Sequence, residues 1–445
     1  MIVMKFGGTS VGNAQAMLDC YEIIKKYKNY NPVVVLSAAS GTTDKLIELI
    51  KSAANNSLDN SLEKIEDIRL RHISIAEEAI KSDLIREETI EKIDFLMMEL
   101  TRLAEGVNLL SECTPKSLDA AASSGELLST TLFTAICNDH SLGAELADAR
   151  QFMKTNNNFL QAQVDTDLLK KLANDLLLSN LHSGKIVITQ GFIGSDEQDR
   201  TTTLGRGGSD YSAALIGAAL SAEEIQIWTD VSGVMTADPK IVPGAVTNTH
   251  LTIEEVRELS FFGAKVLHPE AIKPAIDAKI PVRVLNTKEP ENEGTLILHK
   301  CVFDKPMIRT FVLKENVYIL SRTLTHKEDG FKILSETISK FEAEHIKVYA
   351  SAAANTKTLI IVEKLINMEL ITHFNSEKCS LIALCGVNLA NASKERSSIL
   401  NKITETLDGI SYSALLFGVN TNSVVITMEP EDAKNAIILL HNALH

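Results

Sequence analysis

The sequence predicts an α/β domain built round a mainly parallel sheet, followed by two smaller α+β units. Over residues 1 to about 298, short apolar runs alternate with stretches in which apolar residues recur at helical spacing, a pattern typical of a parallel sheet with helices on its faces. The final third of the chain changes character and repeats itself. Residues 346–349 and 359–362 have counterparts in residues 410–413 and 423–426, about 64 positions further along.

The expected strands of the first domain are short apolar runs, each followed by small or polar residues. Open α/β sheets bind ligands at the carboxyl ends of their strands, so these following residues are candidates for a functional site. The expected strands are residues 2–6, 33–36, 185–190, 225–229 and 282–285, and the residues after them are Gly7 and Gly8, Ser37, Gly191, Asp230 and Asn286.

Two other parts of the chain have a clear periodic pattern. Residues 51–112 are rich in charge and carry apolar residues such as Ile65 and Ile68 at helical spacing, which predicts a helical hairpin that covers the sheet. In each copy of the C-terminal repeat, a strand-like run at 317–320 or 381–384 precedes an amphipathic helix and two further runs. The repeat therefore predicts two β-α-β-β units.

The composition is typical of a globular protein and argues against polyanionic partners. Of 445 residues, 45% are hydrophobic and 23% charged, and the formal net charge of −14 makes nucleic acid and anionic membranes unexpected partners. The six cysteines are scattered without a CxxC pair or zinc-binding spacing, so we expect no metal site built from protein side chains. No apolar run reaches about 18 residues and no signal-peptide pattern is present, which favours a cytoplasmic location.

The segment after the first strand, residues 5–12 (KFGGTSVG), has the features of an anion site. Gly7 and Gly8 let the backbone turn sharply so that its N–H groups approach a ligand, and Ser10 can cap the helix that follows. Lys5 adds a full positive charge beside the glycines, and a phosphate is the natural ligand. Neither a Walker P-loop nor a GxGxxG dinucleotide motif occurs in the chain.

A second glycine-rich turn, residues 203–210 (TLGRGGSD), leads into a helix that Asp210 opens. Phosphoryl transfer needs positive charge and N–H donors round the moving group, together with a fixed acceptor. Lys5 and the first turn suit the phosphate, while Arg206 offers a two-pronged donor for a carboxylate. Alone, such a turn is more often a flexible surface loop.

The two strings resemble the KFGGTSV and GRGGSD motifs of the aspartokinases, in the amino acid kinase family. The resemblance covers essentially the whole chain and implies a three-layer amino acid kinase-like fold over residues 1–298. It implies transfer of the ATP γ-phosphate to the β-carboxylate of L-aspartate, giving 4-phospho-L-aspartate, the first step towards lysine, threonine and methionine. The implied cofactor is ATP with Mg²⁺ bridging its phosphates.

The resemblance also implies roles for individual residues. Lys5 and Asp210 are the expected catalytic residues, Lys5 stabilising the phosphoryl group in transfer and Asp210 organising the lysine. Glu126 is expected to contact the substrate amino group and Arg206 its α-carboxylate. The expected phosphate-binding residues are Gly7, Gly8 and Ser10, and the expected aspartate-binding residues are Ser37, Thr43, Glu126, Arg206 and Ser209.

Residues 228–240 (WTDVSGVMTADPK) resemble the family segment WTDVxGxxTxDPR. Two positions depart from the family pattern, with Met235 where tyrosine is common and Lys240 where arginine is common. Methionine packs on a base without aromatic stacking, and lysine keeps the charge without the fork, so a weakened or rearranged nucleotide contact is expected. The expected nucleotide-binding residues are Thr229, Asp230, Met235, Lys240 and Lys265.

The C-terminal units resemble paired ACT domains, at about 315–380 and 381–445 of a regulatory region spanning 299–445. ACT pairs bind amino acids at their mutual interfaces, so the resemblance implies feedback inhibition by an end product, with lysine preferred to threonine, and a homodimer or dimer of dimers. Lysine-sensitive relatives place Ser-Val-Asp where this chain has Lys347-Val348-Tyr349. This departure predicts weak inhibition by lysine or a different effector.

Three other interpretations compete with this one. Another kinase of the same superfamily, acting on glutamate, carbamate or a nucleotide, does not account for Arg206 together with Glu126 and the ACT pair. A non-catalytic amino-acid sensor does not account for the retention of Lys5 and Asp210. The tandem repeat on its own is also compatible with a platform that only joins chains.

Overall fold

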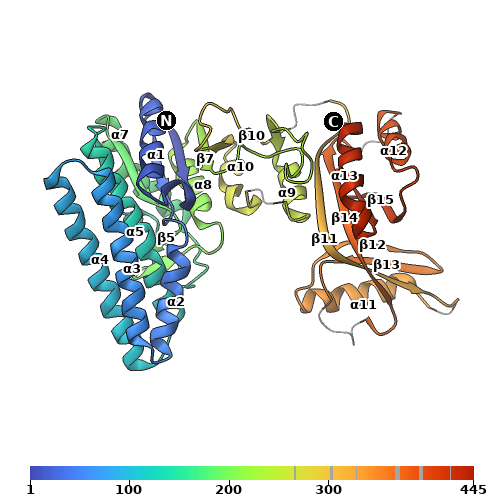
Figure 1. Cartoon of the computed structure of the whole chain (residues 1–445), viewed down its shortest axis with the longest axis horizontal. Coiled ribbons are helices and arrows are strands. Elements are labelled where there is room, and N and C mark those ends of the chain that lie inside the picture. The colour runs from blue at the N-terminus through green and yellow to red at the C-terminus, as the bar shows by residue number, and fades with distance from the viewer. Residues whose placement is uncertain (265–266, 301–303, 327, 366–370, 390–393, 421) are drawn as a thin grey trace. The chain divides into compact units, whose positions relative to one another are not determined.

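The computed structural model describes residues 1–445 except 265–266, 301–303, 327, 366–370, 390–393 and 421 (Figure 1). The chain divides into two compact units. The first consists of Met1–Gly233 and His268–His299, and the second of Val234–Leu267 and Lys300–His445. The second unit therefore takes in a segment from the middle of the sequence. In the part of the chain that is described, no helix combines the length and the apolar character that crossing a bilayer requires.

The first unit is built on the expected mainly parallel sheet. Its strands follow in the order β3-β4-β2-β1-β7-β9-β10, parallel throughout except that β10 is antiparallel to β9. β1 lies inside the sheet between β2 and β7, and all of its residues are buried, as expected for a continuous apolar run in a parallel sheet. The strands are β1 (Ile2–Phe6), β2 (Val33–Leu36), β3 (Ala144–Ala147), β4 (Ile186–Gln190), β7 (Glu224–Thr229), β9 (Val282–Asn286) and β10 (Thr295–Leu298).

Helices and two short strands complete the first unit. The hairpin expected over 51–112 is confirmed as α3 and α4, which lie side by side with α2 and α5 (Figure 1). The hydroxyl of Ser82 caps α4 by accepting a hydrogen bond from the Ile85 N–H. The helices are α1 (Ala14–Lys26), α2 (Thr42–Ala54), α3 (Leu58–Ala79), α4 (Asp83–Leu110), α5 (Pro115–Asp139), α6 (Ala149–Phe152), α7 (Thr166–His182), α8 (Gly208–Leu220) and α10 (Lys273–Asp277), with 3-10 turns η1 (Gly8–Val11), η2 (Lys28–Tyr30) and η3 (Pro269–Ile272), and the antiparallel pair is β5 (Ile193–Ser195) and β6 (Thr201–Thr203).

The alternation of side chains along β1 decides which way its lysine points. Ile2, Met4 and Phe6 belong to the apolar core formed with α1 to α5. Val3 faces the opposite side of the sheet, where its side chain lies against Gly217 of α8. Because side chains alternate along a strand, Lys5 shares the face of Val3 and is directed towards α8.

The second unit contains the expected tandem β-α-β-β repeat. The two copies form one antiparallel six-stranded sheet in the order β12-β13-β11-β14-β16-β15, with the long strands β11 and β14 paired at its centre. The elements of the repeat are β11 (Met307–Thr323), α11 (Gly330–Ala343), β12 (Val348–Ala353) and β13 (Lys357–Val362), then β14 (Asn375–Val387), α12 (Lys394–Thr406), β15 (Tyr412–Asn420) and β16 (Ser423–Met428), followed by α13 (Pro430–Leu444).

The segment Val234–Leu267 carries β8 (His250–Thr252) and α9 (Ile253–Phe261) and packs within the second unit. The Phe311 N–H of β11 donates to the Thr236 carbonyl at 2.7 Å, and the Thr236 hydroxyl lies 2.9 Å from His441 Nε2 of α13. Val242 is buried in the same apolar cluster as Phe311 and Leu440. Both backbone pairing and apolar packing therefore attach this segment to the C-terminal sheet.

Candidate functional site

A cavity of about 690 Å³ lies in the first unit beyond the carboxyl ends of β1 and β2, and the first turns of α2 and α8 and one face of α5 also border it. Open α/β sheets hold their ligands at this edge. Eight of the residues predicted from the sequence line this one cavity: Lys5, Gly8, Ser37, Thr43, Glu126, Arg206, Ser209 and Asp210.

Lys5 and Asp210 form an ion pair at the cavity wall. Lys5 Nζ lies 2.6 Å from Asp210 Oδ1, and both side chains are largely buried. Asp210 stands in the first turn of α8, where the positive end of the helix dipole favours a carboxylate. The pair fixes the lysine ammonium group at the edge where β1 ends.

The two glycines of the turn after β1 differ in their hydrogen bonding. The Gly7 N–H donates to the Trp228 carbonyl at 3.1 Å, so this amide belongs to the packing of the strands and is not available to a ligand. Gly8 begins η1, where the first N–H groups have no intrahelical acceptor. A Cβ at Gly8 would lie 2.7 Å from the Ala38 carbonyl oxygen, so only glycine allows the two loops to approach.

Ser10 lies away from the cavity lining. It is 3% exposed, and its hydroxyl is 3.4 Å from the hydroxyl of Thr287. Among the three residues expected to bind phosphate, the structure therefore places only Gly8 on the cavity.

Glu126 of α5 carries the most unusual carboxyl group of the site. It is 3% exposed, and Oε1 accepts a hydrogen bond from the Ala38 N–H at 3.1 Å. Within the described residues, Oε2 is buried without a hydrogen-bond partner. Burial raises the pKa of Glu126 to about 8. A cationic group of a ligand would supply the missing partner and favour the ionised carboxylate.

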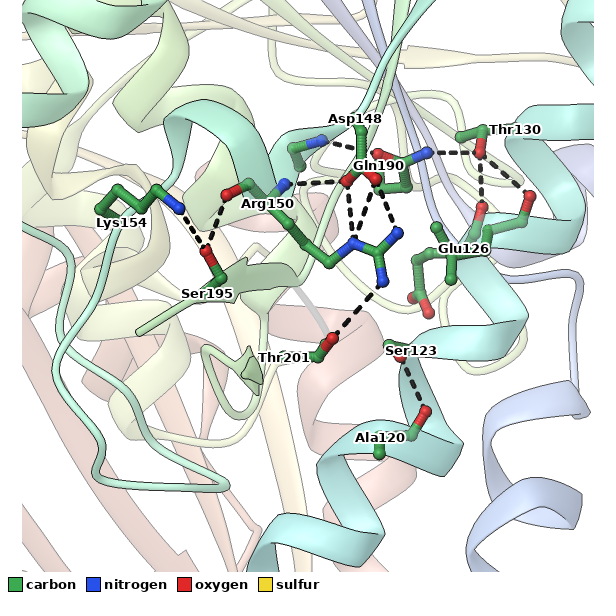
Figure 2. Close-up of polar contacts among 12 residues, drawn as sticks. Ala120, Ser123, Glu126, Thr130, Asp148, Arg150, Lys154, Gln190, Ser195 and Thr201 are labelled. Atoms are coloured by element: carbon green, nitrogen blue, oxygen red, sulfur yellow. Dashed lines mark hydrogen bonds and ion pairs between the residues drawn. The ribbon is translucent and has the colours of Figure 1, made fainter. Parts of the chain in front are cut away.

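Hydrogen bonds on the far side of Glu126 hold its helix in place. The Thr130 hydroxyl donates to the Glu126 carbonyl at 2.8 Å, and Gln190 Nε2 at the end of β4 donates to the Thr130 hydroxyl at 2.8 Å (Figure 2). Arg150, drawn in the same view, is already paired with Asp148 at 2.6 Å. The Arg150 guanidinium is therefore engaged elsewhere and does not neutralise Glu126.

Arg206 is exposed at the cavity and forms no hydrogen bond or ion pair with any residue that the structure describes. Ser37 follows β2, and its backbone is fixed because its N–H donates to Phe6 and its carbonyl accepts from the Ser129 hydroxyl. Thr43 lies in the first turn of α2, and Ser209 lies in the first turn of α8. The cavity thus offers an uncommitted guanidinium, hydroxyl groups and an unpaired carboxyl oxygen, which suits a zwitterionic acid.

The predicted nucleotide-binding residues fall in both units. Thr229 ends β7 in the first unit, and the exposed Asp230 follows it. The Thr229 carbonyl accepts hydrogen bonds from the N–H and hydroxyl of Thr287. Met235 is half-buried and Lys240 exposed in the second unit. Lys265 lies outside the described residues.

Asp119, Leu160 and Phe192 are among the cavity residues that the sequence did not single out. Asp119 precedes Glu126 by two helical turns on α5, and this spacing on one helix face was a signal that could have revealed it. Leu160 and Phe192 adopt left-handed backbone conformations with φ of 72° and 67°. Bulky residues rarely adopt such a φ, so no local pattern predicts them there.

Comparisons with known proteins agree with this geometry. The family model described as "Amino acid kinase family" matches residues 1–286. The lysine-sensitive aspartokinase 3 of Escherichia coli is 33% identical, with all of this chain and 99% of the relative covered. Two crystal structures of E. coli aspartokinase III, each 32% identical and covering 100% of this chain and 99% of that one, are similar with TM-scores of 0.84 for the complex with lysine and aspartate and 0.76 for the complex with aspartate and ADP.

Proposed function

The chain belongs to the aspartokinases of the amino acid kinase family, and from this premise we propose how its own residues transfer the γ-phosphate of ATP to the β-carboxylate of L-aspartate. A β-carboxylate oxygen attacks the γ-phosphorus, the bond from that phosphorus to the β–γ bridging oxygen breaks, and 4-phospho-L-aspartate and ADP leave. The chemistry requires little covalent help from the protein and depends on positioning and charge.

The observation that carries the proposal is the buried, unpartnered oxygen of Glu126. The α-ammonium group of aspartate pairs with this oxygen, and the free guanidinium of Arg206 binds the α-carboxylate. The hydroxyls of Ser37, Thr43 and Ser209 lie on the same cavity and complete the contacts to the substrate. With both α-groups held, the β-carboxylate is the free nucleophile.

Lys5 stabilises the phosphoryl group during its transfer. Its ammonium is already held in place by Asp210, so it stabilises negative charge on the γ-phosphate without reorganising during the reaction. Gly8 begins the 3-10 turn, lines the same cavity, and its N–H is the backbone donor that we assign to the phosphate. Asp210 acts through the lysine by holding it.

Mg²⁺ fits this site as an ion that the nucleotide carries. Among the described residues no three histidine, cysteine or acidic side chains converge on one point, and the Asp210 carboxylate is engaged by Lys5. Mg²⁺ commonly takes its ligands from phosphates and water with only one or two protein carboxylates. When bound, it would offset the negative charge of the ATP phosphates, and the Asp210 oxygen that does not pair with Lys5 could serve as its one protein ligand.

The test is aspartate-dependent release of ADP by the full chain with ATP and Mg²⁺, with hydroxylamine added to trap the acyl phosphate as a hydroxamate. We expect ADP and hydroxamate in equal amounts with aspartate, and neither with glutamate. ADP release with glutamate would assign the chain to another kinase of the superfamily. Binding of aspartate without ADP release would favour a non-catalytic sensor.

We also propose feedback inhibition by lysine through the tandem repeat, which joins chains as a homodimer or dimer of dimers. The sequence similarity to a relative named lysine-sensitive supports lysine as effector. Against strong inhibition, Lys347 Nζ lies 4.7 Å from the ring centre of Phe261, which puts a cation at the point where the sequence departs from the expected lysine-sensitive pattern. Initial rates measured with lysine, threonine, methionine and the lysine–threonine pair test the inhibition. The mass of the assembly in solution tests the oligomeric state. No response to any of them at millimolar concentration would leave the repeat as a platform that joins chains.

We further propose that residues 1–298 carry the kinase activity and residues 299–445 the regulation, and that the protein is cytoplasmic. Cys20, Cys113, Cys137, Cys379 and Cys385 are all free thiols, which agrees with a reducing compartment.

A further inference from the structure

Asp119 is a fully buried carboxylate on α5 that borders the cavity and that no step of the proposed reaction uses. Its oxygens accept hydrogen bonds from three donors. The Thr203 hydroxyl donates at 2.6 Å, the Thr203 N–H at 2.9 Å, and the Leu160 N–H lies 3.0 and 3.2 Å from the two oxygens. The carboxylate therefore joins three segments that are distant in sequence: α5, the loop at Leu160 and strand β6.

One of these hydrogen bonds is donated by a residue in an unfavourable backbone conformation. Leu160 has a φ of 72°, in the left-handed region that disfavours a bulky side chain. Its carbonyl oxygen lies 3.1 Å from the position that a Cβ of Gly205 would occupy, and Gly205 itself has a φ of 77°. The strained loop and the glycine turn are thus packed directly against each other.

The same contacts lead to the guanidinium that lacks a partner. The Ala162 N–H donates to the Thr203 carbonyl at 2.9 Å, and the Leu204 N–H donates to the Phe192 carbonyl at 2.9 Å. Arg206 follows two residues later and has no hydrogen bond or ion pair of its own within the described chain. Its position consequently depends on the turn that Thr203 and Gly205 anchor.

We propose that Asp119 is a positioning residue of the aspartate site, which holds Leu160 in its left-handed conformation and fixes the end of β6 so that Arg206 faces the cavity. The inference rests on the proposed function, because it assigns Arg206 to the substrate carboxylate. Asp119 is not a catalytic residue, since its oxygens are occupied by protein donors. Burial raises the pKa of Asp119 above its usual value, and the hydrogen bonds from Thr203 and Leu160 offset part of that rise.

The first test is the Asp119→Asn variant of the full chain. The amide keeps the size of the side chain but loses one acceptor, so the Thr203 hydroxyl and N–H and the Leu160 N–H can no longer all be satisfied. We expect the aspartate KM to rise about 10- to 100-fold while the ATP KM changes little, because the Arg206 turn is misplaced and the nucleotide contacts are not. Thr203→Val, which removes only the hydroxyl donor, should give a smaller rise of the same parameter and provides the test if Asp119→Asn does not fold.

The second test is a double-mutant cycle with Leu160→Gly. Glycine adopts the left-handed conformation without support, so the loop no longer depends on the carboxylate. Because Leu160 also lines the cavity, the effect of Leu160→Gly alone on the aspartate KM is measured first. We expect Asp119→Asn to raise the aspartate KM less in the Leu160→Gly background than in the wild type. Asp165→Asn is the matched control, because Asp165 caps α7 in the same unit by accepting from the Leu168 N–H. Because asparagine also accepts this capping hydrogen bond, we expect this control to change neither the thermal stability nor the aspartate KM appreciably.

The outcomes separate this inference from the proposed function. A wild-type chain without aspartate-dependent ADP release overturns both. If the wild type is active and Asp119→Asn raises both KM values equally, or leaves the aspartate KM unchanged, only the positioning role is overturned. Independent, additive effects of Asp119→Asn and Leu160→Gly would also overturn it.

Discussion

Asp119 and Glu126 stand two turns apart on α5, border the same cavity and are both buried, yet their hydrogen bonding is opposite. Every donor that Asp119 needs comes from the protein, whereas one oxygen of Glu126 has no partner in the described chain. A buried polar group without a partner is costly, and a folded protein retains one where a ligand completes it. Asp119, whose oxygens accept hydrogen bonds from the protein, supports the site, whereas Glu126, with one oxygen lacking a partner, binds the substrate ammonium group.

Both carboxyl groups bear on catalysis only if phosphoryl transfer takes place at this cavity, and Lys5→Ala tests this with the largest expected effect. Loss of a preorganised positive group at a developing charge typically lowers the rate by about 10² to 10³. We expect that loss in kcat for ADP release, with the fold retained by circular dichroism. Lys64→Ala, which breaks the ion pair between Lys64 and Glu48, is the control and should remain active. Near-normal turnover of Lys5→Ala would place the phosphate elsewhere.

The unpartnered oxygen of Glu126 predicts a selective effect of Glu126→Gln on aspartate binding. The variant keeps the volume but removes the charge that faces the substrate ammonium, a loss of about 2 kcal/mol, or about 30-fold in the aspartate KM. Arg206→Lys should show the same selectivity, because a point charge replaces the fork on the α-carboxylate. Equal changes in the aspartate and ATP KM values for either variant would contradict its assignment to aspartate.

Stability against pH distinguishes the two carboxyl groups directly. The folded pKa of Glu126, about 8, exceeds its usual value of 4.5, so between these values the folded chain holds a proton that the unfolded chain has released. The contribution of Glu126 to the free energy of unfolding therefore falls as the pH rises from about 4.5 to about 8. We expect the Tm of Glu126→Gln to rise relative to the wild type by a few degrees between about pH 5 and about pH 8.5. Asp119→Asn should lower Tm at both pH values, and a constant difference between Glu126→Gln and the wild type would argue against the raised pKa.

The smallest expected effect is the release of a proton when aspartate binds. At neutral pH the Glu126 carboxyl is mostly protonated in the free protein, and the substrate ammonium favours the ionised form, so aspartate binding should release a proton. Calorimetric titrations in two buffers of different ionisation enthalpy measure this release. It should approach one proton per site at about pH 7, vanish well above pH 8 and be absent in Glu126→Gln. Release unchanged in that variant would assign the proton to another group.

The sequence predicted what local patterns encode. Continuous apolar runs marked β1 and β2, helical spacing marked the α3–α4 hairpin, and the offset repeat marked the two β-α-β-β units. The rare KFGGTSVG motif was enough to place Lys5 at the cavity.

What the sequence could not predict depends on contacts between distant segments. The Gly7 amide is bonded to Trp228 and Ser10 is buried beside Thr287, which no property of the KFGGTSVG string reveals. The left-handed φ of Leu160 has no local cause and is held by a carboxylate on another helix. Long-range packing overrides local preference at these positions.

The attachment of Val234–Leu267 to the C-terminal sheet has a consequence for anyone who would recombine these proteins. A junction placed at about residue 298, where the change of sequence pattern suggests it, would separate Ala237 and Val242 from the buried Phe311 and Leu440 that cover them. A chimaera that exchanges the regulatory half between relatives should therefore carry residues 234–267 with the half it donates. The segment to exchange is discontinuous along the chain, so such a chimaera needs one junction on each side of residues 234–267 and another near residue 300.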